Sequence, residues 1–180
     1  MKHEDLSEET IKTETLYSGN LLTVVKNTVR LPTGRLAVRE VVEHRGVVAI
    51  IPILGERLVM VRQFRQACGK TLLELPAGTL RLGETPRECA YRELVEETGY
   101  VPRRLKRLLH CYVAPGSSTE LVHIFVATDL SKTVQAVEDD EVIQVIEVDL
   151  STALQMIERN EIEDAKSIAG ILYFQTYLTS

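Results

Sequence analysis

Four glutamates, Glu84, Glu93, Glu96 and Glu97, are the side chains whose type and spacing most clearly suit chemistry in this chain. Glu93 and Glu97 are one helical turn apart, so on a helix they share a face, and Glu96 lies beside them. Like charges at this spacing destabilise an isolated helix by about 0.2–0.5 kcal/mol. A hard divalent cation such as Mg2+ prefers carboxylate oxygens and would convert that repulsion into attraction. The spacing therefore predicts a metal site, and the alternative is an ordinary solvated helix face.

The residues around these glutamates predict the helix that must carry them. Thr85 can cap it, Pro86 suits the first helical position, and Glu88 completes a capping box. Gly99 suits a left-handed C-terminal cap, so we expect the helix to run from Pro86 to about Thr98. On a helical count, the sector next to the carboxylates is apolar and should face the core; its members are Ala90, Tyr91, Leu94 and Val95.

The same residues resemble the signature of the Nudix family, G-x5-E-x7-R-E-U-x-E-E-x-G-U. Every fixed position matches, namely Gly78, Glu84, Arg92, Glu93, Glu96, Glu97 and Gly99. The last position, usually aliphatic, is Tyr100. The resemblance implies an α+β Nudix fold, in which mixed β-sheets are sandwiched between helices. It also implies a hydrolase that uses Mg2+, or Mn2+, and acts on a nucleoside diphosphate linked to another group.

The resemblance also assigns roles around the metal. Glu93, Glu97 and the backbone carbonyl of Ala77 would be metal ligands, Glu84 would be an outer ligand, and Glu96 would lie close behind them among the catalytic residues. Arg92 would hold the carboxylates in register, besides forming an ordinary i,i+4 ion pair with Glu96.

Activation of water needs a further group. In similar enzymes it comes from a loop well after the signature, where this chain has an acidic turn. Glu141 is the first choice for metal ligand or base, followed by Asp139 and Glu138. The alternative is a solvated acidic turn without a catalytic role.

The flanking sequences narrow the resemblance to the ADP-ribose pyrophosphatase branch of the family. The stretches "VRQFR", "LELPAG" and "VREVVEH" are similar to that branch, as is Pro115, which follows Tyr100 by fifteen residues. The implied substrate-binding residues are Arg62, Arg65, Glu74, Tyr17 and Glu120. Fork-shaped guanidinium groups match phosphate oxygens. The alternative for Arg62 and Arg65 is surface charge that alternates along an exposed strand, and the alternative for Glu74 and Glu120 is a structural role.

The expected reaction is Mg2+-dependent hydrolysis of the pyrophosphate bond of ADP-ribose or a related nucleoside diphosphate sugar. For ADP-ribose the products would be AMP and ribose 5-phosphate. Two alternatives stay open: a Nudix hydrolase for NADH, GDP-mannose or a nucleoside triphosphate, and a module that binds ADP-ribose without cutting it. Modules of the second kind typically lose the signature glutamates, which are all present here.

The remaining sequence predicts the elements that position this site. Three β-rich pieces between residues 16 and 45 form an antiparallel meander, separated at residues 18–20 and 31–34. We expect residues 1–45 to be a small subdomain, exchanged across a homodimer in similar enzymes, and residues 46–180 to be the hydrolase domain. Its expected elements are a hairpin around Gly55-Glu56, a strand running into a Pro-Ala-Gly turn, strands near 107–114, 120–130 and 142–150, and two C-terminal helices.

Composition excludes several other classes of protein. The net charge of -5 over 180 residues argues against a protein that coats nucleic acid. Three cysteines at unpatterned spacing indicate neither a disulfide framework nor a zinc clip. The first residues lack the apolar stretch of a signal peptide, and no run is long enough to span a membrane, so we expect a cytoplasmic protein.

Overall fold

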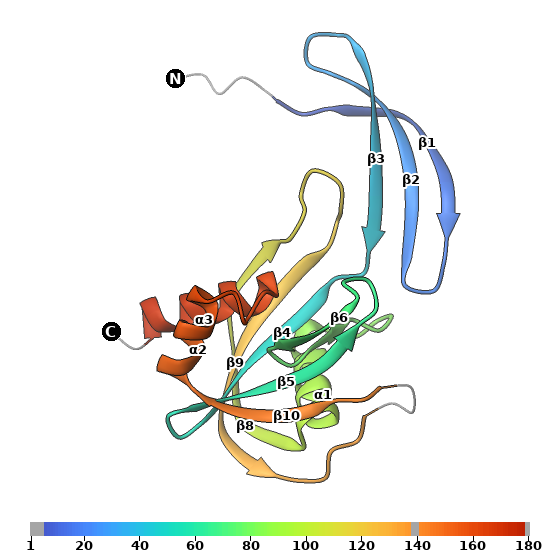
Figure 1. Cartoon of the computed structure of the whole chain (residues 1–180). Coiled ribbons are helices and arrows are strands. Elements are labelled where there is room, and N and C mark those ends of the chain that lie inside the picture. The colour runs from blue at the N-terminus through green and yellow to red at the C-terminus, as the bar shows by residue number, and fades with distance from the viewer. Residues whose placement is uncertain (1–5, 138–140, 179–180) are drawn as a thin grey trace. The chain divides into compact units, whose positions relative to one another are not determined.

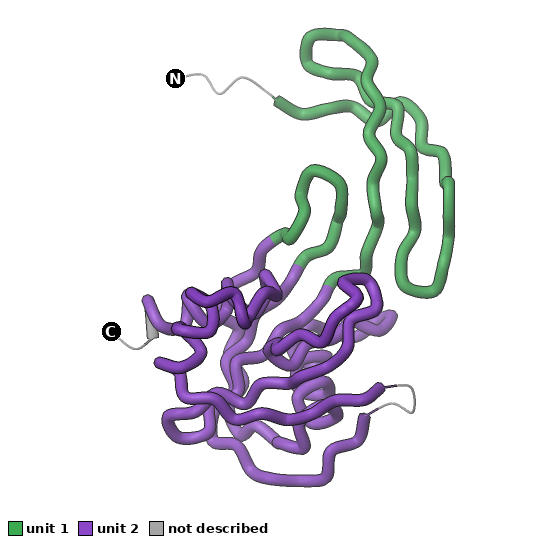
Figure 2. Tube along the Cα trace, in the orientation of Figure 1, with its two compact units in different colours: residues 1–46, 112–121 green, residues 47–111, 122–180 purple. Residues whose placement is uncertain are grey.

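The computed structural model describes residues 6–137 and 141–178 of the chain (Figure 1). The chain divides into two compact units, coloured separately in Figure 2. Unit 1 consists of residues 1–46 and 112–121, and unit 2 consists of residues 47–111 and 122–180. Within the described residues, no helix is both long and apolar enough to cross a membrane.

Unit 1 is built on a three-stranded antiparallel sheet. Its strands are β1 (Glu9–Ser18), β2 (Leu22–Arg30) and β3 (Leu36–His44), in that order. The two turns fall where the sequence predicts them, and Gly34 takes a positive φ of 84° that suits glycine. Among the hydrophobic side chains of this sheet that are described, only Val25 and Val29 are buried, so the sheet has almost no core of its own.

Unit 2 contains a mixed seven-stranded sheet. Its strands are β4 (Val47–Leu54), β5 (Arg57–Arg65), β6 (Lys70–Glu74), β7 (Ala77–Thr79), β8 (Tyr100–Tyr112), β9 (Leu121–Lys132) and β10 (Gln144–Asp149). The main order is β10-β5-β4-β9-β8, while β6 pairs with β5 and β7 pairs with β4. Strand β4 is parallel to β9 and antiparallel to β5 and β7. This arrangement, with three helices, is the predicted α+β class.

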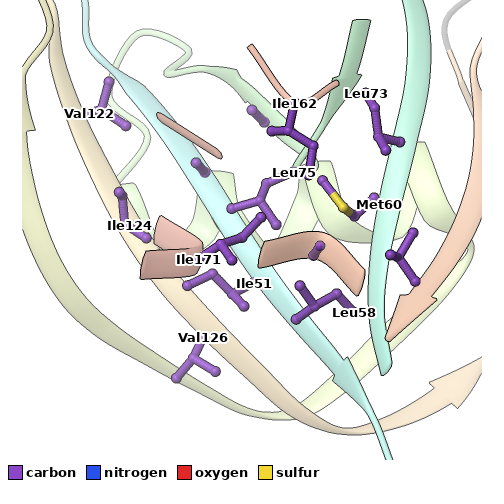
Figure 3. Packing of buried hydrophobic residues seen from close by; sticks show 14 of the residues in the cluster. Ile51, Leu58, Met60, Leu73, Leu75, Val122, Ile124, Val126, Ile162 and Ile171 are labelled. Carbon is purple, nitrogen blue, oxygen red and sulfur yellow. The ribbon is translucent and has the colours of Figure 1, made fainter. Parts of the chain in front are cut away.

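Strand β4 is the centre of the packing because it is apolar and buried on both faces. On one face, Ala49 and Ile51 join the larger core beneath helices α2 (Leu150–Glu158) and α3 (Ala165–Leu178). Figure 3 shows this core, in which Ile171 lies beside Ile51 and Leu75. On the other face, Val48 and Ile50 pack against helix α1 (Pro86–Thr98).

Three details of the predicted strands were wrong. Strand β1 begins at Glu9, before the predicted start of the first β-rich piece at residue 16. The Pro-Ala-Gly segment is not a turn: Ala77–Thr79 is strand β7, paired with Val47–Ala49. Pro76 has no N–H to donate to a neighbouring strand, but its carbonyl accepts a hydrogen bond from the amide of Ile50 in β4. At Pro76 the chain therefore passes from β6, which pairs with β5, to β7, which pairs with β4. Strand β8 begins at Tyr100, well before the predicted residue 107, because the chain enters it directly after the helix cap.

The core face of helix α1 also differs from the predicted one. Tyr91 is 46% exposed, whereas Cys89 and Glu97 are buried together with Ala90 and Leu94. The helix is rotated toward its carboxylate side, since the neighbouring strand β7 offers a glycine there. This rotation brings the glutamates against the sheet instead of leaving them at the solvent boundary.

Candidate functional site

Helix α1 begins and ends where its sequence requires. The amide of Glu88 donates to Oγ1 of Thr85 at 3.3 Å, and the amide of Thr85 donates to Oε2 of Glu88 at 2.9 Å, which is the predicted capping box. Gly99 closes the other end with φ 68°, and its amide donates to the carbonyl of Val95 at 3.0 Å. These caps fix the helical register, and hence the positions of its glutamates.

Gly78 allows the helix to approach strand β7 closely. A Cβ atom added at Gly78 would lie closer than 3.0 Å to the carboxylate of Glu93, a distance that real Cβ atoms do not show. The first fixed glycine of the signature therefore has a steric reason here, because the carboxylate of Glu93 occupies the volume that a side chain at residue 78 would need.

Glu97 is the most buried acidic side chain of the helix, with 3% of its surface exposed. Burial raises the pKa of Glu97 to about 8, and the neighbouring charges of Glu93 and Glu141 act in the same direction. The amide of Ala77 donates to Oε2 of Glu97 at 3.0 Å and opposes the shift. Burial also raises the pKa of Glu93. Both carboxylates would be stabilised by a nearby cation, so the donors present fit a divalent metal ion.

Arg92 holds the other side of the cluster. Its Nε and Nη2 donate to the two oxygens of Glu84 at 2.7 and 2.8 Å, and its Nη1 donates to Glu93 at 2.6 Å and to Glu96 at 3.0 Å. The hydrogen bonds from Arg92 lower the pKa of Glu84 to about 2. One guanidinium group therefore links three signature glutamates, including the expected i,i+4 partner.

The candidate metal and catalytic residues that the structure describes all belong to unit 2. Glu141 is close enough to Glu93 and Glu97 for its charge to raise the pKa of both. Glu138 and Asp139 lie outside the described residues. Over residues 6–137 and 141–178, no three His, Cys, Asp or Glu side chains are gathered as closely as a preformed metal cluster. Oxygens of three glutamates are bonded to Arg92 instead.

Arg65, on strand β5, is paired with a buried carboxylate. Its Nε and Nη2 donate to the two oxygens of Glu74 at 2.7 and 2.9 Å, and its guanidinium interacts electrostatically with Glu97. The side chain of Arg65 is still 38% exposed. Arg62 is also exposed, but it is three residues away on strand β5, so its side chain leaves the opposite face of the strand.

Glu74 is almost completely buried, with 1% of its surface exposed. Burial pushes its pKa upward, but the hydrogen bonds from Arg65 and Lys166 outweigh it, and the pKa of Glu74 falls below its ordinary value. The carboxylate of Glu74 is thus already bonded inside the protein. Sequence reasoning missed Lys166, which is 92 residues away from Glu74 in the chain and has no local motif to mark it.

The two other predicted substrate residues belong to unit 1. Tyr17, on strand β1, is 59% exposed, and its ring lies against Gly19. Glu120 is half-buried, and its backbone amide donates to Oγ of Ser118 at 3.1 Å. The predicted set is therefore divided between the two units.

Comparisons with known proteins identify the family. Residues 43–170 match the NUDIX domain. The ADP-ribose pyrophosphatase of Bacillus subtilis (strain 168) is 39% identical over 175 residues, which cover 96% of this chain and 95% of that protein. The methanol dehydrogenase activator of Bacillus methanolicus is 42% identical over 171 residues, covering 93% and 92%.

A solved structure described as "Crystal structure of ADP compounds hydrolase" has a TM-score of 0.86 and covers 98% of this chain and 97% of its own. At 23% identity this likeness shows the fold alone, and it confirms the predicted fold class. The family match and the Bacillus subtilis relative confirm the resemblance carried by the glutamate signature. The chain belongs to the Nudix family.

Proposed function

We propose that this protein hydrolyses the pyrophosphate bond of ADP-ribose, or of related nucleoside diphosphate sugars, to a nucleoside monophosphate and a sugar phosphate. With ADP-ribose the products are AMP and ribose 5-phosphate. The observation that carries the proposal is a pair of desolvated carboxylates: Glu93 packs over Gly78, and Glu97 is buried with the guanidinium of Arg65 near enough to interact with it. Carboxylates that favour a metal, beside a fork-shaped cation, suit a diphosphate.

The proposed cofactor is Mg2+, with Mn2+ as a substitute. Glu93, Glu97 and the carbonyl of Ala77 would hold the metal, and Glu84 would serve as an outer ligand. Both carboxylate oxygens of Glu84 accept hydrogen bonds from Arg92, which supports the proposed role of Glu84 as an outer ligand. When bound, such ions would neutralise phosphate charge and lower the pKa of a coordinated water.

The chain's own residues have distinct proposed tasks. Glu141 orients the attacking water and accepts its proton. The proximity of Glu141 to Glu93 and Glu97 supports this role. Asp139 and Glu138 are the next candidates for it. Through Arg92, Glu96 helps to keep the carboxylate cluster in register.

Arg65 donates to the diphosphate with the N–H groups that Glu74 leaves free, and Glu74 keeps that guanidinium in place. We retain Arg62, Tyr17 and Glu120 as candidates for the substrate pocket. Tyr17 would stack on the base with its exposed ring.

Overall similarity does not choose the substrate, because the two relatives at 39% and 42% identity have different names. The rivals are a Nudix hydrolase for NADH, GDP-mannose or a nucleoside triphosphate, and a non-catalytic ADP-ribose-binding module. Retention of all four signature glutamates favours catalysis over binding alone.

Product chromatography tests the proposal directly. The purified protein is incubated with Mg2+ and each of ADP-ribose, NADH, GDP-mannose and ATP, and the products are separated. We expect AMP and ribose 5-phosphate to form fastest from ADP-ribose. Preference for ATP over every diphosphate sugar would reject the proposed substrate class, and binding of ADP-ribose without turnover would support the non-catalytic module.

We also propose that the protein is a cytoplasmic homodimer in which residues 1–45 are exchanged between two chains. The three free cysteines suit a reducing compartment. The sheet of unit 1 exposes several large apolar side chains that a second copy would cover, among them Ile11, Leu16, Leu36 and Val38.

A further inference from the structure

A chain of charged groups joins the start of helix α3 to Arg65. Nζ of Lys166 donates to Oε2 of Glu74 at 2.7 Å and to Oδ1 of Asp164 at 2.7 Å. The same carboxylate of Glu74 accepts both hydrogen bonds from Arg65. Glu74 therefore lies between two cations, one from strand β5 and one from helix α3.

Burial makes this arrangement energetically demanding. Side-chain exposure is 1% for Glu74, 14% for Lys166 and 15% for Asp164, whereas Arg65 is 38% exposed. A buried carboxylate needs its partners, because charges interact strongly where water is restricted. The four groups together are neutral, so loss of Lys166 would leave a net negative set next to Arg65. That charge would oppose an anionic substrate.

Helix α3 has other contacts at this end besides those of Lys166. The amide of Leu75 donates to Oγ of the fully buried Ser167 at 2.7 Å, and Ser167 is bonded in turn to Asp164. Lys70 of strand β6 also forms an ion pair with Glu163, just before the helix. Because other contacts hold the helix here, the bond from Lys166 to Glu74 invites a separate explanation.

We propose that Lys166 is a positioning residue of the substrate site: it fixes the Glu74 carboxylate against which Arg65 is aligned, and it balances the negative charge behind Arg65. Lys166 does not touch the substrate, since its ammonium is directed to Glu74 and Asp164. The inference rests on the proposed function, because it requires Arg65 to meet a diphosphate. It adds a residue from helix α3 to a site whose other candidate residues all precede that helix in the chain.

Steady-state kinetics with ADP-ribose and Mg2+ test this role in Lys166→Met, Lys166→Arg and Lys166→Gln. We expect Lys166→Met to raise KM about three- to tenfold with little change in kcat, because a charge behind Arg65 acts on substrate binding. Lys166→Arg should restore the wild-type KM. Lys166→Gln keeps a donor without the charge, so its KM should also rise, less than that of Lys166→Met.

Lys70→Met is the matched control, since it removes a lysine ion pair at the same junction of β6 and α3 without touching Glu74. Lys70 is the cross-strand neighbour of Arg65, but it is 48% exposed and paired with Glu163, so its loss should change KM less than the loss of Lys166. Thermal unfolding of every variant separates stability from positioning: a purely structural role would lower Tm and the active fraction, and therefore kcat, at constant KM. Unchanged KM in both Lys166→Met and Lys166→Gln would overturn the inference.

Calorimetric titration of ADP-ribose, with Ca2+ in place of Mg2+, supplies a readout independent of turnover. Weaker binding by Lys166→Met than by wild type and Lys166→Arg supports the inference even if Lys166→Met has lost activity through poor folding of a fraction of the molecules. Equal affinities for the three proteins contradict it. A wild-type protein that hydrolyses no diphosphate sugar would instead reject the proposed function, and the titration would still report on Lys166.

Discussion

At the scale of single residues, the decisive feature is a carboxylate placed where its charge is unfavourable. Glu97 is 3% exposed and lies near two other acids, Glu93 and Glu141. Among the described residues, the amide of Ala77 is the group that donates a hydrogen bond to its carboxylate. A cation would stabilise this arrangement, which is why we assign Glu97 a metal-binding role rather than a structural one.

Glu97→Gln should lower kcat by about two or more orders of magnitude, because the variant removes a full negative charge from the proposed metal site while keeping nearly the same shape. The amide oxygen of glutamine can still accept from Ala77, so the protein should remain folded. Mg2+-dependent turnover of ADP-ribose and circular dichroism check both points. Full activity in this variant would refute the metal assignment.

The metal-free protein should become less stable as the pH rises from 4.5 to about 8. Glu97 has a pKa of about 8 in the folded protein, against an ordinary 4.5, so the folded state binds the extra proton across this interval. Stability therefore falls wherever the folded state holds more protons than the unfolded state. Denaturant unfolding of chelator-treated protein at several pH values measures the slope. Glu97→Gln should flatten it, and an identical slope in that variant would assign the effect to other groups.

At the scale of elements, the site depends on the contact between helix α1 and strand β7. The helix has a full capping box and a left-handed glycine cap, both of which are local and readable in the sequence. Its rotation about its own axis is not local, because it depends on Gly78 across the interface. This explains why Cys89 is buried while Tyr91, predicted to be core, is exposed.

Gly78→Ala should reduce activity strongly, because the added methyl group displaces the Glu93 carboxylate that Arg92 holds. The free energy of unfolding should fall by only about 1–3 kcal/mol, as is typical of overpacking. Kinetics and denaturant unfolding separate the two effects. Gly116→Ala is the control, since a Cβ at Gly116 meets no atom within 4 Å. Equal activity in both variants would show that close approach at Gly78 is unimportant for catalysis.

At the scale of the whole molecule, unit 1 and unit 2 differ in how many hydrophobic side chains they bury. Unit 2 contains two hydrophobic clusters on the two faces of strand β4. All of strand β1 is exposed, and the sheet of unit 1 buries only Val25 and Val29 among its described hydrophobic side chains. A three-stranded sheet with so little core is marginal alone, which supports the proposed exchange between two copies.

Substitution of Leu36 and Val38 together by glutamate should convert the proposed dimer into a monomer. Both side chains lie on strand β3 with more than half of their surface exposed, at 64% and 53%, and buried charges would oppose association. Light scattering of the purified proteins gives the mass. Leu82→Glu is the control, because Leu82 is 95% exposed in unit 2. A wild-type mass equal to one chain would reject the dimer.

The sequence by itself determined the signature helix, its caps, the approximate positions of most strands along the chain and the identity of the signature glutamates. These features depend on residues a few positions apart, and short-range spacing is visible in any chain. Only the tertiary structure decided which way the helix is rotated, that Arg65 is bonded to Glu74, and that Lys166 completes the pair from 92 residues away. Such contacts depend on packing between distant segments, where the residue types alone permit many partners.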